Sequence, residues 1–390
     1  MASTAIYASR ILTPHEEILD SVIVVEDGKI TQIGHRDEVR VPQDAEHFAA
    51  GDKIVIPGFV DVHIHGAGGH DVMEGTAEAI AKVAATVARR GTTSLVATTV
   101  TAPPEETCKS LKGIARYIRS PRNTEPRFAA EVLGIHLEGP FISPVRRGVH
   151  PRDAIASPSK ELFDEFVAAA DGLIRIITLA PELPGALELV ERAVSKGIVA
   201  SMGHTDATYE QAWAAIAHGV THAAHMFNAM RPFSHRDTGV IGAVLTSPAV
   251  MAELIADGHH VDSPAVEILL RAKGLETILL VSDGTAATGM RDGTYRLGNF
   301  EVTVTGGVVR NSEGKLAGST LSLDLALQHI VALGVPLIDA VRMATLLPAR
   351  RVGLGGKKGV IAIGADADIV ILHQDLRLAG VMTRGAGLSA

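Results

Sequence analysis

The sequence predicts an α/β fold: a (β/α)8 TIM-like barrel with a small β-sandwich domain formed by both chain ends. Three observations lead to this prediction. The middle of the chain alternates strand-like and helix-like segments, and both ends are strand-like. The 390 residues also exceed the roughly 250 that such a barrel needs, which leaves room for a second module. We expect the small β domain over residues 1–56 and 352–390, and the barrel over residues 57–351.

The two chain ends carry the patterns of a small sheet. Residues 21–33 are typical of two strands around Asp27-Gly28, a dipeptide that accepts the positive φ angles of a tight turn. Near the other end, residues 359–364 lead into a second apolar run at residues 367–372. Because these similar segments flank a long α/β middle, we expect them to form one domain.

The middle of the chain predicts a closed parallel sheet. We expect eight strands: Phe59–His65, Thr93–Thr99, Glu131–Leu137, Ile174–Leu179, Ile198–Met202, Val220–His225, Met251–Ala256 and Ile278–Ser282. Six helices are expected between them: Ala77–Arg90, Glu105–Ile118, Lys160–Ala170, Ala186–Ser195, Tyr209–His218 and Pro264–Ala272. Helical crossovers make the strands parallel, and eight strands suffice to close a barrel. Beyond the eighth strand we expect a hairpin over Tyr295–Arg310 and two closing helices, Ser319–Leu333 and Leu337–Leu346.

Composition and charge exclude several classes of protein. The net charge is -8 and no run of Lys or Arg occurs, which argues against nucleic acid or an anionic membrane as the main partner. The single cysteine, Cys108, cannot form a disulfide within the chain and fits a reducing compartment. The first twenty residues hold no signal-peptide core, and no apolar run is long enough to span a bilayer. We therefore expect a cytoplasmic protein.

The first expected barrel strand ends in two histidines. Residues 57–66 read PGFVDVHIHG, so His63 and His65 point to the same face, with Asp61 beneath them. Two imidazole nitrogens at one strand end can bind one metal ion. The alternative is a pair of hydrogen-bonded core histidines.

Polar residues at the ends of other strands favour the metal site. The carboxyl ends of barrel strands meet at one rim, where catalytic groups of such folds lie. The expected metal ligands at this rim are His63, His65, Glu138, His204, His225 and Asp283. Nitrogen and oxygen ligands without a thiolate suit Zn, Fe or Mn.

The expected ligand set also predicts a chemistry. A divalent metal lowers the pKa of bound water from 15.7 to about 7 and polarises a carbonyl group. Asp283 beside that water can take its proton and later pass it to a leaving nitrogen. The alternatives for Asp283 are a purely structural ligand or a helix N-cap.

Several motifs of the sequence resemble those of a known family. Residues 57–65 and 364–369 (GADADI) resemble the amidohydrolase superfamily in general. More specific motifs resemble the N-acetylglucosamine-6-phosphate deacetylase family: 136–142 (HLEGPFI), 148–150 (GVH), 203–205 (GHT), 225–230 (HMFNAM) and 256–262 (ADGHHVD). Many members of the superfamily bridge two metals with a modified lysine at the fourth strand. Here that strand ends in residues 179–182, LAPE, so Glu138 would be the bridge.

The resemblance implies roles for individual residues. Glu138, His204 and His225 would hold one divalent metal, and His63 and His65 with Glu138 and Asp283 would hold a second, so one or two ions per subunit are expected. Asp283 would act as general base and acid. Further substrate contacts are implied for His150, which would lie near the 3-hydroxyl and help polarise the acetyl carbonyl, and for Val149, Asn228, Ala229, Leu316, Ala317 and Gly318. His260 and Arg236 would pair with the 6-phosphate.

In the family the arginine that matches Arg236 comes from the neighbouring subunit, which implies a homodimer. The surrounding loop also contains Arg231 and His235, either of which could share this work, and a solvated arginine is the alternative. His136, on the same strand face as Glu138, is expected to orient it.

The reaction that the resemblance implies is hydrolysis of the N-acetyl group of N-acetylglucosamine 6-phosphate to glucosamine 6-phosphate and acetate. One alternative is another metal-dependent amidohydrolase, acting on a cyclic imide, a ureide or an N-acyl amino acid. The other is a non-catalytic relative that serves as a scaffold. Neither a metal ligand nor the Asp at the eighth strand is missing, which argues against the scaffold.

Overall fold

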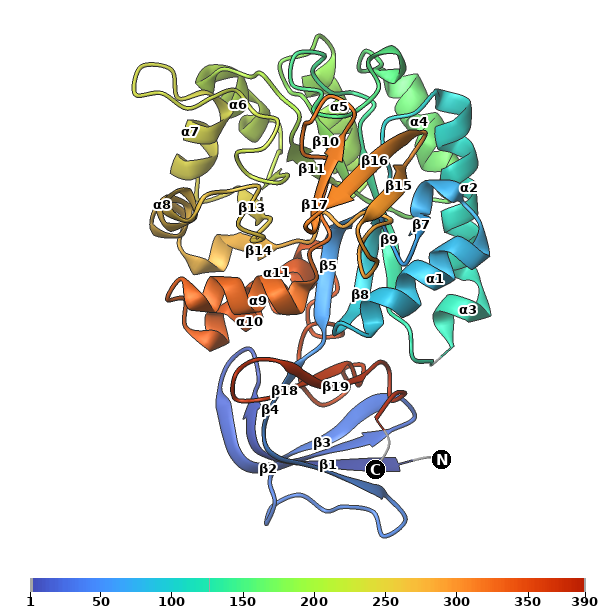
Figure 1. Cartoon of the computed structure of the whole chain (residues 1–390), viewed down its shortest axis with the longest axis vertical. Coiled ribbons are helices and arrows are strands. Elements are labelled where there is room, and N and C mark those ends of the chain that lie inside the picture. The colour runs from blue at the N-terminus through green and yellow to red at the C-terminus, as the bar shows by residue number, and fades with distance from the viewer. Residues whose placement is uncertain (1–2, 126, 389–390) are drawn as a thin grey trace.

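The computed structural model describes residues 3–125 and 127–388 and shows two packed parts, a barrel and a smaller sheet (Figure 1). The barrel strands are β5 (Phe59–Ile64), β8 (Thr92–Thr98), β9 (Glu131–Glu138), β10 (Ile174–Leu179), β11 (Val199–Met202), β12 (His222–Ala223), β13 (Met251–Leu254) and β14 (Ile278–Leu280). They pair in parallel in this order. The ring closes through bonds from Asp283 N to His63 O (2.9 Å) and from His65 N to Gly284 O (2.8 Å). The predicted barrel is therefore confirmed.

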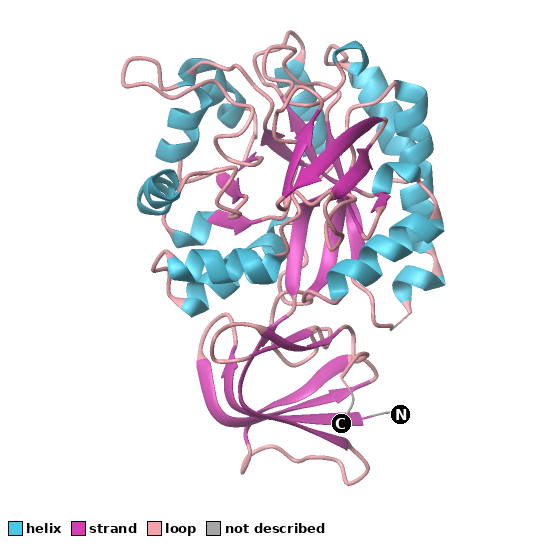
Figure 2. Cartoon of the chain, viewed as in Figure 1, coloured by secondary structure: helices cyan, strands magenta, loops and turns pink. Residues whose placement is uncertain are grey.

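Helices surround the barrel, as expected for parallel strands with crossovers (Figure 2). They are α1 (Ala77–Ala88), α2 (Pro104–Arg119), α3 (Pro121–Thr124), α4 (Lys160–Ala169), α5 (Ala186–Ser195), α6 (Tyr209–Ala217), α7 (Gly239–Thr246) and α8 (Ser263–Lys273). The six predicted helices all occur. Helix α7 was not predicted because its sequence, GVIGAVLT, is apolar on all sides and has no amphipathic period. It packs against α6 and α8.

Several predicted strand and helix ends were wrong. The seventh and eighth strands end two residues earlier than predicted, at Leu254 and Leu280, and two other differences are larger. The sixth strand covers only β12, not Val220–His225, because the chain turns at His225, whose φ is 26°. The first closing helix begins at Leu323, not at Ser319. Residues before it are extended instead, since Ser319 N donates to Asp283 O at 2.7 Å and Thr285 N donates to Ser319 O at 3.0 Å.

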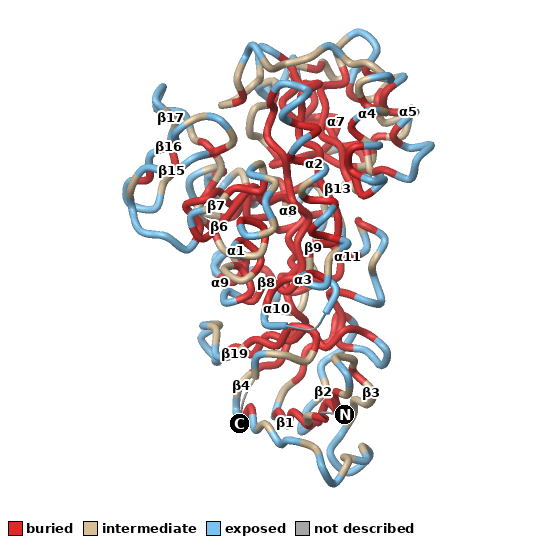
Figure 3. The backbone as a smooth tube through the Cα atoms, turned by 90° about the vertical axis from the view of Figure 1, so that its right-hand side faces the viewer, coloured by how far each residue is buried: buried red, intermediate tan, exposed pale blue. Residues whose placement is uncertain are grey.

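A small three-stranded sheet follows the barrel where a hairpin was predicted. Its strands are β15 (Gly293–Leu297), β16 (Phe300–Thr305) and β17 (Val308–Asn311), and they project from one side of the barrel (Figure 3). Two short strands, β6 (Gly66–Ala67) and β7 (His70–Asp71), pair with each other after β5. The closing helices are α9 (Leu323–Ala332), α10 (Leu337–Ala344) and α11 (Leu346–Arg351).

Both chain ends build the second sheet, as predicted. Its strands are β1 (Ser3–Leu12), β2 (Glu17–Glu26), β3 (Lys29–His35), β4 (Glu46–Pro57), β18 (Ile369–Leu372) and β19 (Leu378–Met382), in the order β19-β18-β4-β1-β2-β3. The β2–β3 turn has the expected positive φ angles at Asp27 (49°) and Gly28 (76°). Ile30 N donates to Ala365 O at 3.0 Å, which ties β3 to the segment before β18. Apolar residues from both chain ends therefore share one core.

A buried lysine connects this sheet to the barrel. Lys358 is fully buried, and its Nζ lies 2.6 Å from Glu131 Oε2, 2.9 Å from Asp366 Oδ2 and 2.8 Å from Asp368 Oδ2. Burial alone would lower the pKa of Lys358, but the three carboxylates hold it well above its usual range. Since Glu131 begins β9 and Asp368 precedes β18, the charged cluster fixes the two parts against each other. Among the residues described, no helix is both long and apolar enough to cross a membrane.

We predict that Lys358→Met lowers the free energy of unfolding by about 3–5 kcal/mol, because it leaves buried carboxylates without their cation. Urea unfolding followed by circular dichroism at pH 7 measures this difference. Lys357→Ala is the matched control: its Nζ is half-exposed and 3.8 Å from Asp366 Oδ2, so we expect a change within about 0.5 kcal/mol. Equal unfolding midpoints for the two variants would contradict a structural role for the cluster.

Candidate metal centre and substrate cavity

The six predicted ligands lie together at the carboxyl rim of the barrel: His63, His65, Glu138, His204, His225 and Asp283. Glu138 is central. Its Oε1 lies 3.0 Å from His225 Nε2, 3.3 Å from His204 Nε2 and 3.4 Å from His63 Nε2. Its Oε2 lies 3.4 Å from His65 Nε2. Asp283 Oδ1 lies 3.1 Å from His65 Nε2 and 3.7 Å from His63 Nε2. One carboxylate therefore faces all four imidazoles.

The backbone at three of these positions is left-handed. His204, His225 and Asp283 have φ angles of 48°, 26° and 48°, which residues other than glycine rarely adopt. Each lies two or three residues after a barrel strand, and the turn there brings its side chain into the cluster. Such strain persists only where the surrounding structure holds it, and it concentrates at functional sites.

The second ring nitrogen of three histidines is fixed by an acceptor. His65 Nδ1 lies 3.1 Å from Thr98 O, and His204 Nδ1 lies 3.1 Å from Arg146 O. His63 Nδ1 lies 2.7 Å from Glu253 Oε2. Carbonyl and carboxylate oxygens only accept, so Nδ1 carries the proton and Nε2 presents a lone pair to the cluster. His63 Nε2 is buried and has no hydrogen-bond partner among the described residues.

The charged groups of the cluster favour a bound cation. Burial would raise the pKa of Glu138, but His63, His150 and the other imidazoles hold it well below its usual range. Burial would likewise lower the pKa of His65, but Asp283 and Glu138 raise it. The environment thus favours positive charge between carboxylates and imidazoles. A divalent metal supplies that charge while the imidazoles stay neutral, so these residues fit a metal.

A cavity of about 220 Å³ opens onto this cluster. The predicted residues that line it are His65, Glu138, Val149, His150, His204, His225, Asn228, Ala229, His260, Asp283, Leu316 and Gly318. His63 is fully buried beneath it, and Ala317 is buried in the core of β15–β17. Val100, Gly148 and Leu297 also line the cavity and were not predicted. Leu297 belongs to the projecting sheet, and no local pattern shows where that sheet packs.

His150 has the opposite tautomer to His63, His65 and His204. Its Nδ1 accepts a hydrogen bond from Thr101 N at 3.3 Å and lies 2.7 Å from Thr101 Oγ1. Because a backbone N–H can only donate, the proton of a neutral His150 ring sits on Nε2. Nε2 lies 3.6 Å from Glu138 Oε2. His150 therefore presents an N–H donor to the cavity, next to the metal cluster.

His260 and Arg236, the two predicted phosphate contacts, lie in different places. His260 lines the cavity, whereas its neighbour His259 is exposed to solvent. Arg236 is exposed and lies at a separate hollow with Phe233. Arg231 is held by Asp237 (Nη2 to Oδ2, 2.7 Å), so its guanidinium is not free. Within one chain the structure does not bring Arg236 to the cavity.

Two expectations about neighbouring residues were wrong. His136 does not orient Glu138, because its ring nitrogens bond to Val62 O (3.1 Å) and Thr178 Oγ1 (2.7 Å). Burial lowers the pKa of His136 to about 3, so its ring is neutral. Asp61 does not line the cavity beneath His63 but a different hollow, of about 310 Å³, on the flank of the barrel.

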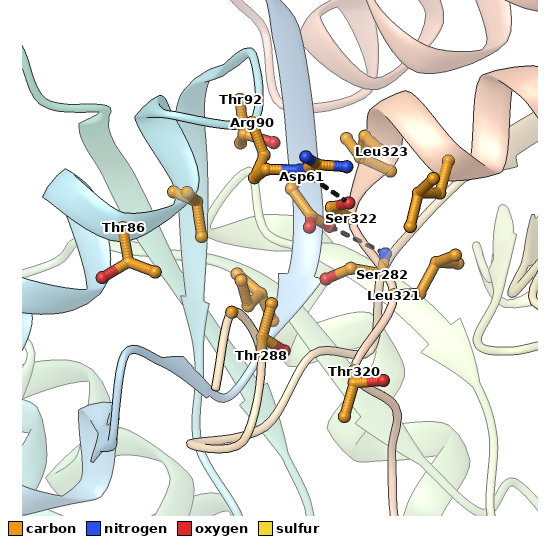
Figure 4. Close-up of a pocket in the computed structure, with 14 residues that line it drawn as sticks. Asp61, Thr86, Arg90, Thr92, Ser282, Thr288, Thr320, Leu321, Ser322 and Leu323 are labelled. Carbon is orange, nitrogen blue, oxygen red and sulfur yellow. Dashed lines mark hydrogen bonds between the residues drawn. The ribbon is translucent and has the colours of Figure 1, made fainter. Parts of the chain in front are cut away.

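Asp61 has a structural role at that flank. Its Oδ1 accepts hydrogen bonds from His63 N (3.2 Å) and Ser282 N (3.3 Å). Figure 4 shows the Asp61–Ser282 bond, and near it the bond from Arg90 to Ser322. Burial raises the pKa of Asp61 to about 6. Asp61 thus holds together the two strand ends that carry His63 and Asp283.

One buried acidic residue near the metal cluster was missed. Glu253 on β13 contacts His63, His222 and the backbone of His225. An isolated Glu in the apolar run of residues 250–256 (VMAELIA) was the signal that could have found it, since an unpaired buried carboxylate is costly.

A parallel (β/α)8 barrel whose rim carries four histidines and two carboxylates around one point defines a metal-dependent hydrolase. Comparison with known proteins gives the family. The profile of the amidohydrolase family matches residues 54–386. The N-acetylglucosamine-6-phosphate deacetylase of Bacillus subtilis (strain 168) is 35% identical over 376 residues, 96% of this chain and 94% of that protein. An N-acetylgalactosamine-6-phosphate deacetylase of Escherichia coli O157:H7 is 37% identical over 97% of each chain.

A solved structure agrees with these relatives. It is a mutant of the Mycobacterium smegmatis N-acetyl-D-glucosamine-6-phosphate deacetylase in complex with N-acetyl-D-glucosamine-6-phosphate, with a TM-score of 0.91, 35% identity and 99% of each chain covered. The chain belongs to the amidohydrolase family, within the group of N-acetylglucosamine-6-phosphate deacetylases.

We predict that Asp257→Asn lowers the free energy of unfolding by an amount that depends on pH. Asp257 Oδ2 lies 2.7 Å from His260 Nδ1. Burial would raise the pKa of Asp257, but the bonds from His260 and from His259 N lower it to about 2. Because the pKa is lowered on folding, ionised Asp257 contributes its full stabilisation at pH values above the pKa of the unfolded chain, near 4. This contribution is lost as the pH falls toward 2. We expect a deficit on the order of 2 kcal/mol at pH 6 that narrows below pH 4.

Urea unfolding of both proteins at pH 6, 4 and 3 measures this deficit. Asp37→Asn is the control, because the Asp37 side chain is 91% exposed and should change little at any of these pH values. A deficit that stays constant from pH 6 to pH 3 would show that ionised Asp257 does not support His260.

Proposed function

We propose that this protein hydrolyses the N-acetyl group of N-acetylglucosamine 6-phosphate, giving glucosamine 6-phosphate and acetate. One observation carries the proposal: a single cavity combines the predicted metal cluster, the Asp283 carboxylate and the N–H donor of His150. Acyl transfer needs such a set, namely a proton acceptor and a donor to the carbonyl oxygen. The similarity to deacetylases over nearly the whole chain supports the same reaction.

Asp283 is suited to the proton transfers. Burial would raise its pKa, but the hydrogen bond with His65 and the charge of His63 hold it below its usual range, so the group begins as a carboxylate. The carboxylate accepts a proton from the attacking water, whose oxygen bonds to the acetyl carbon. The same proton then passes to the sugar nitrogen as the C–N bond breaks. His150 Nε2–H donates to the carbonyl oxygen as negative charge develops there.

The metal would contribute Lewis acidity and a lowered water pKa when bound. We propose one or two divalent ions per subunit, of Zn, Fe or Mn. Glu138, His204 and His225 would hold one ion, and His63 and His65 with Glu138 and Asp283 would hold the other. Nitrogen and oxygen donors without a cysteine suit these metals.

We propose that the 6-phosphate is bound by His260 of one subunit and by Arg236 of its partner in a homodimer. Arg236 is exposed and makes no ion pair in the described part of the chain, so its guanidinium is free to bind an anion. Phe233 in the same loop is 52% exposed, and aromatic side chains are enriched in protein interfaces.

N-acetylgalactosamine 6-phosphate is the second candidate substrate. The Escherichia coli O157:H7 relative of that name matches this chain at 37% identity, within the 35–38% range of relatives named for the glucosamine sugar. The two sugars differ only in the configuration of one ring hydroxyl, so the same metal, proton and phosphate contacts serve both. Activity on each sugar must therefore be measured side by side.

We further propose a reducing, cytoplasmic location. Cys108, the only cysteine of the chain, is buried and unpaired. A lone buried thiol is typical of proteins that do not depend on disulfides.

We predict rapid acetate release from N-acetylglucosamine 6-phosphate and little from the unphosphorylated sugar. A coupled acetate assay on protein of known metal content measures it, with N-acetylgalactosamine 6-phosphate as the third substrate. Chelation should abolish turnover, and Asp283→Asn should lower kcat by about 10²- to 10⁴-fold, because the variant cannot carry the proton. No turnover of either phosphorylated sugar by metal-loaded protein would exclude the proposed function.

We predict that Arg236→Ala lowers kcat/KM by about 10- to 100-fold, since it removes a charge-assisted bond to phosphate. Mixing denatured Arg236→Ala and Asp283→Asn chains and refolding them tests which subunit supplies the arginine. Half of the dimers are then mixed, and one site in each is intact, so about a quarter of the wild-type activity should return. If Arg236 served its own subunit, mixing would restore no activity.

A further inference from the structure

We propose that Glu253, on β13, is a positioning residue that sets the affinity of the His63–His65 side of the metal centre. The seventh barrel strand contributes no side chain to the cavity lining. Its buried carboxylate nevertheless lies directly behind the metal cluster, where Glu253 is fully buried. The inference rests on the proposed metal assignment and is independent of which sugar is the substrate.

Glu253 connects three parts of the rim. Its Oε2 lies 2.7 Å from His63 Nδ1 and accepts a hydrogen bond from His225 N at 3.1 Å. Its Oε1 lies 2.8 Å from His222 Nε2. One side chain on β13 thus fixes a ligand ring on β5, the backbone of a second ligand after β12, and a third imidazole on β12 itself.

The carboxylate determines which nitrogen of His63 faces the cluster. Because the carboxylate only accepts, His63 Nδ1 carries the proton and Nε2 keeps its lone pair. A ligand histidine that bonds to a carboxylate is a stronger donor than one that bonds to a neutral group. His65 and His204 bond to backbone carbonyls instead. Among the three histidines with a fixed Nδ1, only His63 has a charged partner.

This difference between the histidines predicts that Glu253 affects the two proposed metal positions unequally. Loss of the Glu253 charge should weaken the ion held by His63 and His65 more than the ion held by Glu138, His204 and His225. Glu253→Gln removes the charge at nearly constant size. The amide oxygen can still accept from His63, while the amide NH2 faces His222. The His222 ring can then carry its proton on Nδ1, which is buried and unpartnered among the described residues, and accept from the NH2 at Nε2. The variant can therefore keep the local packing.

The experiment is titration of metal-free protein with Zn²⁺ in competition with a chromophoric chelator, together with metal analysis after dialysis. For Glu253→Gln we expect the affinity for the second equivalent of Zn²⁺, held by His63 and His65, to fall about 10- to 100-fold. The first equivalent, held by Glu138, His204 and His225, should still bind. Glu253→Asp keeps the charge and should recover part of that affinity. We expect kcat to fall in Glu253→Gln at saturating substrate, with little change in KM, because no substrate contact is removed.

His136→Gln is the matched control. His136 is also a fully buried histidine, and its ring packs against that of His63 at 4.6 Å between centroids, but it makes no hydrogen bond to it. Its Zn²⁺ affinities should equal those of the wild type. Thermal unfolding of the metal-free variants separates a loss of folding from a loss of metal.

Three results would overturn the proposal. The first is a Glu253→Gln protein whose second equivalent binds within about threefold of the wild-type affinity. The second is an equal loss in His136→Gln, which would indicate general disturbance of the core. The third is wild-type protein that binds only one Zn²⁺. Failure of the proposed sugar reaction would leave the Zn²⁺ titrations unaffected, so the two failures can be told apart.

Discussion

The site depends on the hydrogen bonds that close the barrel. His63 O accepts from Asp283 N, and Gly284 O accepts from His65 N, so the end of the first strand meets the chain after the eighth strand. Residues more than 200 positions apart in the sequence thereby face one another in a single cluster of histidines and carboxylates. Asp61 supports the same junction from the flank, because it accepts from the backbone of both segments. Without this closure the histidine pair and the carboxylate would have no common centre.

The buried charges around this junction are arranged so that they compensate one another. Four imidazoles surround Glu138, and Glu253 lies behind them on β13. Buried charges are costly unless they are paired and hydrogen-bonded, and here the partner of each charge is another functional group or the expected cation. The left-handed backbone at His204, His225 and Asp283 adds strain at the same rim. The stability of the barrel supports this strain, and the strain in turn directs the side chains.

The histidines show that chemical role depends on the partner of the second ring nitrogen. His65 and His204 donate through Nδ1 to carbonyl oxygens, which leaves Nε2 free to bind a metal. His150 accepts at Nδ1 from Thr101 N, which leaves an N–H at Nε2. The same side chain therefore presents a lone pair in one place and an N–H donor in another.

The sequence by itself determined the order of strands and helices, the two-ended small sheet and the identity of the rim residues. These features follow from local periods, from turn residues such as Asp27-Gly28, and from the rule that parallel strands expose their carboxyl ends at one rim. Helix α7 was not predicted because an all-apolar segment has no amphipathic period. The extended conformation of residues 319–322 was not predicted because their hydrogen-bond partners lie at residues 283–285. Only the tertiary structure decided which nitrogen each histidine presents, where Asp61 points and what Glu253 contacts. Those answers depend on atoms contributed by other strands, such as Thr98 for His65 and Glu253 for His63, and no local pattern contains them.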